Sequence, residues 1–491
     1  MSGKSVIAID QGTTSTRAIR FGADGTVSAS VARELPQYYP HPGRVEQDAE
    51  DIWSGTLECL RGVLDDDVAA IGITNQRETI ILWDRESGQS LHNAIVWQDR
   101  RTADMCEAMR KDGLEPAVRE KTGLLLDPYF SATKLRWLLD TVPGAREQAM
   151  QGKLAAGTVD SFLLWRLSGG RVHATDLTNA SRTLLYDIRR HCWDDELLEM
   201  FDIPAPLLPD VCDNAHVFGE TDPALTGRAV PIAGMAGDQQ AALIGQRCFA
   251  PGMIKSTYGT GCFLLANIGA DPLFSSNRLL TSPAYRIGDE SAYALEGAIF
   301  IAGAAVKWLR DTLGLIASAE DMGRLAASVP DDHGVHLVPA FVGLGAPHWR
   351  SDVRAAVTGM TLDTGPAHFA RATLEAAAFQ TCDLLDAMVA DGVSAPSLMR
   401  IDGGMAGNDW FAQCLADLTG LVIERPANHE TTALGAALLA GTTVGLWPDK
   451  YGPEEAPDSL AIFHPAIGQA VRAERRGRWG AAVRQVLGAS H

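Results

Sequence analysis

The chain has 491 residues, 46% of them hydrophobic and 21% charged, which is typical of a globular protein with more than one hydrophobic core. Lysine and arginine number 42, against 61 aspartates and glutamates, so the net charge is −19. That charge argues against nucleic acid or an anionic membrane as the main partner, because both are themselves negatively charged.

The distribution of cysteine and of apolar residues argues against further classes of protein. None of the eight cysteines has the CxxC spacing of a zinc knuckle or dithiol site, and a disulfide framework is not expected in so long and cysteine-poor a chain. The longest apolar run, residues 298–306, is far below the roughly 20 residues of a membrane helix. Asp10 interrupts the first apolar stretch where a signal peptide would need its core. We therefore expect a cytoplasmic protein without a membrane span.

Strand-like and helical segments alternate along the chain, which predicts an α/β fold. The first 75 residues are expected to form, in order, strands at 6–10, 17–21 and 26–32, a helix at 48–64 and a buried strand at 68–74.

The first tight turn, residues 10–16, has the composition of a phosphate-binding loop. Gly12 lets the backbone approach an anion, and Thr13, Thr14 and Ser15 supply hydroxyl donors. Asp10, at the end of the strand, is placed to hold Mg²⁺. Taken alone, an ordinary hairpin turn explains the same residues. Neither a standard P-loop nor a dinucleotide G-x-G-x-x-G motif is present.

The opening pattern returns near the middle of the chain. A strand at 253–258 leads into Gly259-Thr260-Gly261, and a second strand follows at 262–268. This repetition predicts two related domains, 1–248 and 249–491. Residues 402–408, a third glycine-rich segment, follow a strand at 398–401 and are suited to admit a ribose or a flat base, although a plain strand-to-helix turn is the alternative.

Two further segments carry candidate catalytic and polyol-binding groups. Asp238 lies between a strand and a helix, where it is a helix N-cap, a general base, or both. Arg77 and Glu78 follow the strand at 68–74 and offer a fixed donor fork beside an acceptor, a pair suited to vicinal hydroxyls. A surface ion pair is the alternative for them, and core packing is the alternative for Trp97 and Tyr129.

Taken together, these segments resemble the FGGY family of sugar and polyol kinases over nearly the whole chain. The matching segments are residues 10–16, 73–78, 94–97, 100–101, 127–130, 157–160, 178–182, 236–241, 257–263, 295–297, 339–341, 343–347, 402–404 and 432–437.

The resemblance implies two actin-like, ribonuclease-H-like domains that close on a cleft, and conversion of glycerol to glycerol 3-phosphate by ATP with Mg²⁺. By analogy, Asp238 is the base and, with Asp10, acts at the metal. The residues implied for glycerol are Arg77, Glu78, Trp97, Tyr129, Asp238, Gln239 and Phe263. Those implied for the nucleotide are Thr13, Thr14, Ser15, Arg17, Thr260, Gly303, Lys307, Gly404 and Asn408. We also expect a homo-oligomer, a dimer or a tetramer.

One position departs from the family pattern, and other functions remain open. Lys307 stands where the family often has a glutamine on the adenine side, which leaves the contacts to the base undetermined. A kinase for another polyol or a ketose is the nearest alternative. A nucleotide-gated binding protein on the same fold is a second, and Asp10 and Asp238 argue against it. A hydride-transfer enzyme is disfavoured by the missing dinucleotide motif.

Overall fold

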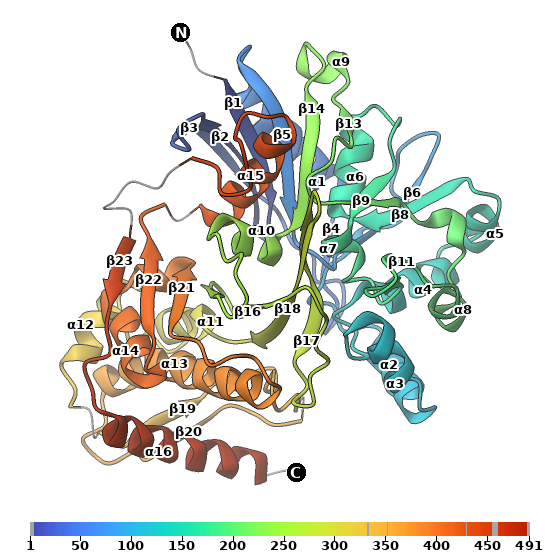
Figure 1. Cartoon of the computed structure of the whole chain (residues 1–491). Helices are drawn as coiled ribbons and strands as arrows, with labels where there is room; N and C mark the ends of the chain where they lie inside the picture. The colour runs from blue at the N-terminus through green and yellow to red at the C-terminus, as the bar shows by residue number, and fades with distance from the viewer. Residues whose placement is uncertain (1–3, 331–332, 351, 429, 454–459, 489–491) are drawn as a thin grey trace.

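The computed structural model describes residues 4–330, 333–350, 352–428, 430–453 and 460–488. These residues form two mixed sheets, one from each half of the chain, with helices packed on both (Figure 1). The expected α/β fold is therefore confirmed.

The first sheet contains all four strands expected in the first 75 residues, at nearly the expected bounds. Its order is β13–β14–β5–β1–β2–β3, with β1–β2–β3 antiparallel and β14, β5 and β1 parallel. The strands are β1 (Ser5–Gln11), β2 (Ser15–Gly22), β3 (Val27–Glu34), β5 (Val68–Asn75), β13 (Gly219–Glu220) and β14 (Pro231–Gly237).

The second sheet repeats this plan, as the recurring turn predicted. Its order is β17–β18–β16–β15–β21–β22–β23, and β15 is again antiparallel to the strand after its turn and parallel to β21. The strands are β15 (Ile254–Tyr258), β16 (Cys262–Gly269), β17 (Leu280–Ile287), β18 (Glu290–Ile299), β21 (Leu398–Asp402), β22 (Val422–Pro426) and β23 (Leu460–Phe463).

A lobe between β5 and β14 carries part of the candidate polyol site. Its sheet, β4–β7–β6–β8, comprises β4 (Glu46–Gln47), β7 (Ala94–Ile95), β6 (Ile80–Asp84) and β8 (Leu154–Thr158). Short strand pairs complete the described strands: β9 (Ala174–Asp176) with β12 (Asp210–Cys212), β10 (Tyr186–Asp187) with β11 (Cys192–Trp193), and β19 (His336–Val338) with β20 (Ala356–Thr358).

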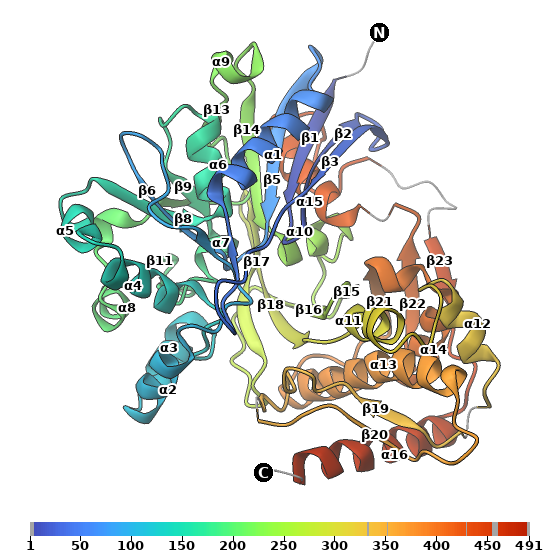
Figure 2. The same ribbon diagram turned by 180° about the vertical axis from the view of Figure 1, so that it is seen from behind.

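Helices cover both sheets and fill the lobe. In the first half they are α1 (Ala49–Val63), α2 (Ala103–Lys111), α3 (Glu115–Thr122), α4 (Ser131–Thr141), α5 (Ala145–Met150), α6 (Val159–Leu167), α7 (Leu177–Ala180), α8 (Asp195–Phe201), η1 (Ala205–Leu207), α9 (Pro223–Thr226) and α10 (Asp238–Gly245). In the second half they are α11 (Gly303–Lys307), η2 (Trp308–Thr312), α12 (Asp321–Ala327), α13 (Pro366–Ala390), η3 (Gly404–Gly407), α14 (Asp409–Thr419), α15 (Thr431–Thr443) and α16 (Gln469–Gly488). Figure 2 shows α13 beneath the second sheet, with α16 on its outer side. Among the described residues, no helix has both the length and the apolar character needed to cross a bilayer.

Strand β1 is buried on both faces because helices from different halves of the chain cover it. Ile7 and Ile9 belong to the core that contains the apolar side of α1. Val6 and Ala8, which point the other way along the strand, belong to the core that contains residues of α15. In Figure 1 the red α15 lies in front of the blue strands of the first sheet.

Helix α15 approaches its neighbours too closely for side chains at several glycines. A Cβ on Gly72 would lie 2.1 Å from the carbonyl oxygen of Ala436, and one on Gly435 would lie 1.8 Å from the carbonyl oxygen of Ala241 in α10. A helix of the second half is therefore locked against the first sheet and against the helix that carries Asp238.

We expect Gly435→Ala to destabilise the protein, by about 1–3 kcal/mol as an overpacked site does. Gly477→Ala is the matched control, because both glycines are helical and a Cβ on Gly477 meets nothing within 4 Å. The control should gain up to about 1 kcal/mol from helix propensity. Denaturant unfolding of both variants measures the difference, and a stabilised Gly435→Ala protein would disprove the close helix crossing.

Candidate active site between the two domains

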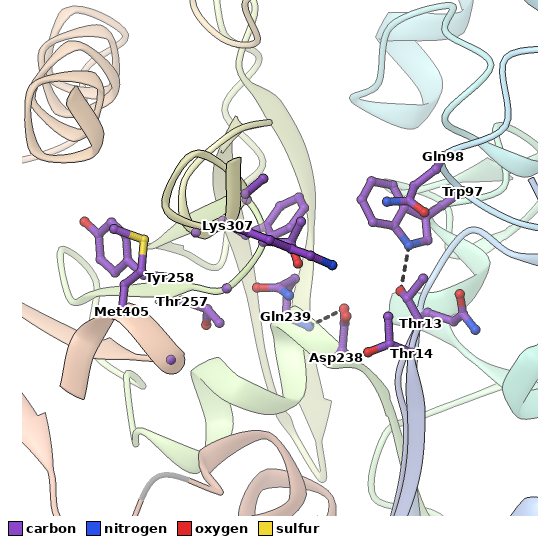
Figure 3. Close-up of a pocket in the computed structure, with 18 of the residues that line it drawn as sticks. Thr13, Thr14, Trp97, Gln98, Asp238, Gln239, Thr257, Tyr258, Lys307 and Met405 are labelled. Atoms are coloured by element: carbon purple, nitrogen blue, oxygen red, sulfur yellow. Dashed lines mark hydrogen bonds between the residues drawn. The ribbon is translucent and has the colours of Figure 1, made fainter. Parts of the chain in front are cut away.

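A cavity of about 760 Å³ lies between the two halves and collects most of the predicted site residues. Figure 3 shows groups from both halves facing into it. The predicted residues that line it are Thr13, Thr14, Arg77, Glu78, Trp97, Tyr129, Asp238, Gln239, Thr260, Phe263, Gly303, Lys307, Gly404 and Asn408. Asp10, Ser15 and Arg17 are not among its lining residues.

The first glycine turn joins β1 to β2 and closes on itself. The Gly12 N–H donates to the carbonyl oxygen of Ser15 at 2.9 Å, which fixes the turn and leaves Thr13 and Thr14 at the cavity. Thr13 Oγ1 also accepts a hydrogen bond of 2.9 Å from Trp97 Nε1 (Figure 3). The predicted phosphate-binding turn and one aromatic residue of the predicted polyol site are therefore in direct contact.

The second turn lies on the opposite side of the cavity and abuts α11. The Gly259 N–H donates to Gly261 at 2.9 Å, and the Gly303 N–H donates to Gly259 at 3.0 Å. A Cβ on Gly303 would lie 2.6 Å from the Gly259 carbonyl oxygen, so this junction requires glycine.

The third glycine segment follows β21. Gly403 has φ +89°, a conformation that favours glycine, and Gly404 lines the cavity beside it. Asn408 caps α14 by accepting the Phe411 N–H at 3.2 Å through Oδ1, and its amide nitrogen remains a donor for a ligand.

Asp238 is the first residue of α10, directly after β14. The N-cap is Gly237, so the expected cap position is displaced by one residue. Asp238 Oδ1 accepts the Gln239 N–H at 2.7 Å and lies 3.3 Å from Arg77 Nε. Burial raises the pKa of Asp238 above the usual aspartate range, and Glu78 adds to the rise while Arg77 opposes it. A raised pKa makes the carboxylate a stronger proton acceptor.

Asp10 is not among the lining residues of the cavity, and Arg17 binds a carboxylate outside it. Burial and then the charge of Asp238 raise the pKa of Asp10 to about 7, and its carboxylate has no hydrogen bond or ion pair within the described residues. The Arg17 guanidinium binds Glu430, at 2.7 and 2.9 Å to its two carboxylate oxygens. Its predicted contact with phosphates therefore stays a prediction.

Aromatic rings form one wall of the cavity. The ring of Trp97 meets Tyr129 edge-on at 5.6 Å between centroids, and Phe263 at 6.3 Å. Trp97 and Tyr129 come from the first half, and Phe263 comes from β16 of the second. Together they can cover the carbon skeleton of a small polyol.

Arg77 and Glu78 belong to a buried ion network whose other members sequence analysis did not assign. Arg77 donates to both carboxylate oxygens of Glu296, at 2.7 and 3.0 Å, and Arg182 donates to Glu78 at 2.7 Å and to Glu296 at 3.1 Å. Although burial favours the neutral acid, Arg182 and Arg77 lower the pKa of Glu296 to about 2. The network joins the first domain to β18.

Lys255 is a further buried cation that the sequence did not single out. Its ammonium donates to the Gln239 side chain and, at 2.9 Å, to Thr257 Oγ1. It therefore fixes the amide of Gln239 at the cavity.

Both segments that contain Glu296 and Arg182 match the family, but no local pattern shows that they meet across more than a hundred residues.

Comparisons with known proteins identify the same family that the sequence resembles. Residues 5–245 match the model of the N-terminal domain of the FGGY family of carbohydrate kinases, and residues 254–444 match its C-terminal domain. Proteins named glycerol kinase in Gluconobacter oxydans and Rhodospirillum centenum are 56% and 57% identical. Each alignment covers 98% of this chain, with 95% and 97% of the respective relative.

Solved structures agree in fold. The crystal structure of Plasmodium falciparum glycerol kinase with ADP has a TM-score of 0.91 at 35% identity, covering 99% of this chain and 98% of that one. A gluconate kinase from Lactobacillus acidophilus, at 23% identity and a TM-score of 0.88 over 99% of both chains, shares the fold. Because the models of both family domains match, over residues 5–245 and 254–444, the chain belongs to the FGGY family of carbohydrate kinases.

Proposed function

We propose that this protein transfers the terminal phosphoryl group of ATP to a primary hydroxyl of glycerol, forming sn-glycerol 3-phosphate. The observation that carries the proposal is one cavity in which a polyol-sized aromatic and ionic site adjoins two glycine turns, with Asp238 between them. The relatives named glycerol kinase support glycerol as the substrate.

The donor and acceptor groups of the cavity suit the hydroxyls of glycerol. Arg77 and Glu78 are both 2% exposed and held by the ion network, so little freedom is lost when a hydroxyl binds them. Gln239 is fixed by Lys255. Trp97 and Phe263 pack beside the carbon atoms.

Asp238 orients the attacking hydroxyl and takes its proton late in the transfer. Outright deprotonation of an alcohol is difficult, so alignment with the terminal phosphorus and stabilisation of the transferring group supply most of the catalysis. The turns at Thr13–Thr14 and Gly259–Gly261 line the cavity, and their backbone amides and hydroxyls would contact the phosphates. Gly404 and Asn408 then adjoin the ribose and the base.

The carboxylates fit a magnesium ion shared with the nucleotide. The described residues contain no group of three or more side chains that would hold a metal alone. Mg²⁺ is usually bound by one or two carboxylates plus phosphates and water. Burial and then the charge of Asp238 raise the pKa of Asp10 to about 7, so a cation bound beside Asp10 would favour its ionised form. Bound there, the ion would neutralise charge on the phosphates.

Assembly as a dimer or tetramer stays a prediction.

Release of ADP, measured with glycerol, erythritol, xylulose and gluconate, tests the proposed function. We expect glycerol to have the highest kcat/KM, by at least about tenfold, because a longer chain would displace the rings of Trp97, Tyr129 and Phe263 from their contacts with one another and with the carbon skeleton. A higher kcat/KM for another acceptor would assign the protein to a different substrate. Nucleotide binding without ADP release for any acceptor would instead favour a nucleotide-gated binding protein.

A further inference from the structure

Lys307 differs from every other charged group of the cavity in having no fixed partner. It is the last residue of α11, its side chain is exposed, and within the described residues it makes no hydrogen bond or ion pair. Asp311, the carboxylate on which its charge acts, is bound by Arg310 at 2.6 Å. Its ammonium is therefore available to a ligand.

The rest of the cavity is short of positive charge. Arg77 is the other cation that lines it, and its guanidinium is taken up by Glu296, Glu78 and Asp238. Glu78 and Asp238 place two carboxyl groups in the lining. A nucleotide bound here carries several negative charges on its phosphates, so one free ammonium on the second domain would be a major attraction for them.

The direction of the side chain distinguishes the phosphates from the base. Figure 3 shows the Lys307 amine directed into the open centre of the cavity, toward the side of Asp238 and Thr13 and away from Met405 and Tyr258. Met405 and Tyr258 lie at the other end of the cavity, and their apolar surface suits a flat base. Sequence analysis placed position 307 on the adenine side of the pocket, yet the amine of Lys307 is directed away from that side.

We propose that Lys307 binds the terminal phosphates of the nucleotide rather than the base. The inference rests on the proposed function only in taking a nucleoside triphosphate as the ligand. A lysine in place of the family's frequent glutamine then adds a charge-assisted contact to the phosphoryl donor.

Binding measured by calorimetry without polyol tests this, with adenosine, ADP and a non-hydrolysable ATP analogue, each in the presence of Mg²⁺. For Lys307→Met we expect Kd to rise at least about fivefold for ADP and the analogue, and less than twofold for adenosine. Lys307→Arg keeps the charge and should stay within about threefold of wild type. Arg310→Met, one turn further along and paired with Asp311, is the matched control and should change none of the three.

An equal loss for adenosine would assign Lys307 to the base or ribose and overturn the proposal. Unchanged ADP binding, or the same loss in Arg310→Met, would overturn it as well. Because these measurements need no acceptor, a protein that fails to phosphorylate glycerol but shows the expected pattern disproves the proposed substrate and not the role of Lys307.

Discussion

Asp238→Asn is expected to lower turnover at saturating glycerol and ATP by at least about 10²-fold, the lower end of what a general base contributes. Asparagine keeps the volume and can still accept the Gln239 N–H, but its amide oxygen takes up no proton. It also removes the charge that faces Asp10. Initial rates of ADP release measure the loss.

The control for this variant is Asp289→Asn, because Asp289 is an exposed aspartate outside the cavity. It should retain wild-type turnover. Retention of more than a tenth of wild-type turnover by Asp238→Asn would show that the base is another group. A matching loss in ADP affinity would show that Asp238 acts on the nucleotide instead.

Arg77→Ala is expected to raise the KM for glycerol by about 10- to 150-fold, the range of a lost hydrogen bond to a charged group, with far less effect on the KM for ATP. The same variant should unfold at lower denaturant concentration. Removing one partner of a buried ion pair costs about 3–5 kcal/mol, and here Glu296 keeps Arg182 as its remaining partner, so the lower end is expected.

Arg33→Ala is the control, since Arg33 pairs with Glu58 on the exposed surface. Both its KM values and its unfolding midpoint should stay close to wild type. If Arg77→Ala raised the KM for ATP more than that for glycerol, Arg77 would belong to the nucleotide site. If the KM for glycerol were unchanged while stability fell, Arg77 would only support the structure.

The two experiments separate the proposed roles of two side chains that lie 3.3 Å apart, from Arg77 Nε to Asp238 Oδ1. Loss of a general base lowers turnover, because a base acts only when the proton moves. Loss of a group that binds the substrate in the ground state raises the KM for that substrate.

The sequence by itself determined the local elements and their order. A buried strand followed by a glycine turn occurs at 6–16 and again at 253–261. Both features are specified by residues a few positions apart, the strand by its pattern of apolar residues and the turn by the conformational freedom of glycine. The order of these segments along the chain was enough to identify the family, which the comparisons then confirmed. Most predicted site residues line one cavity. They do so because the turns at equivalent strand ends of the two domains face the same cleft.

Only the tertiary structure decided which charges meet. Arg17 binds Glu430 and Arg77 binds Glu296, while Lys307 has no partner in the part of the chain that the structure describes. These outcomes depend on α15 packing against the first sheet and on β18 bringing Glu296 to Arg77. Ion pairs between residues hundreds of positions apart are set by how sheets and helices pack, and no spacing or periodicity along the chain encodes that geometry.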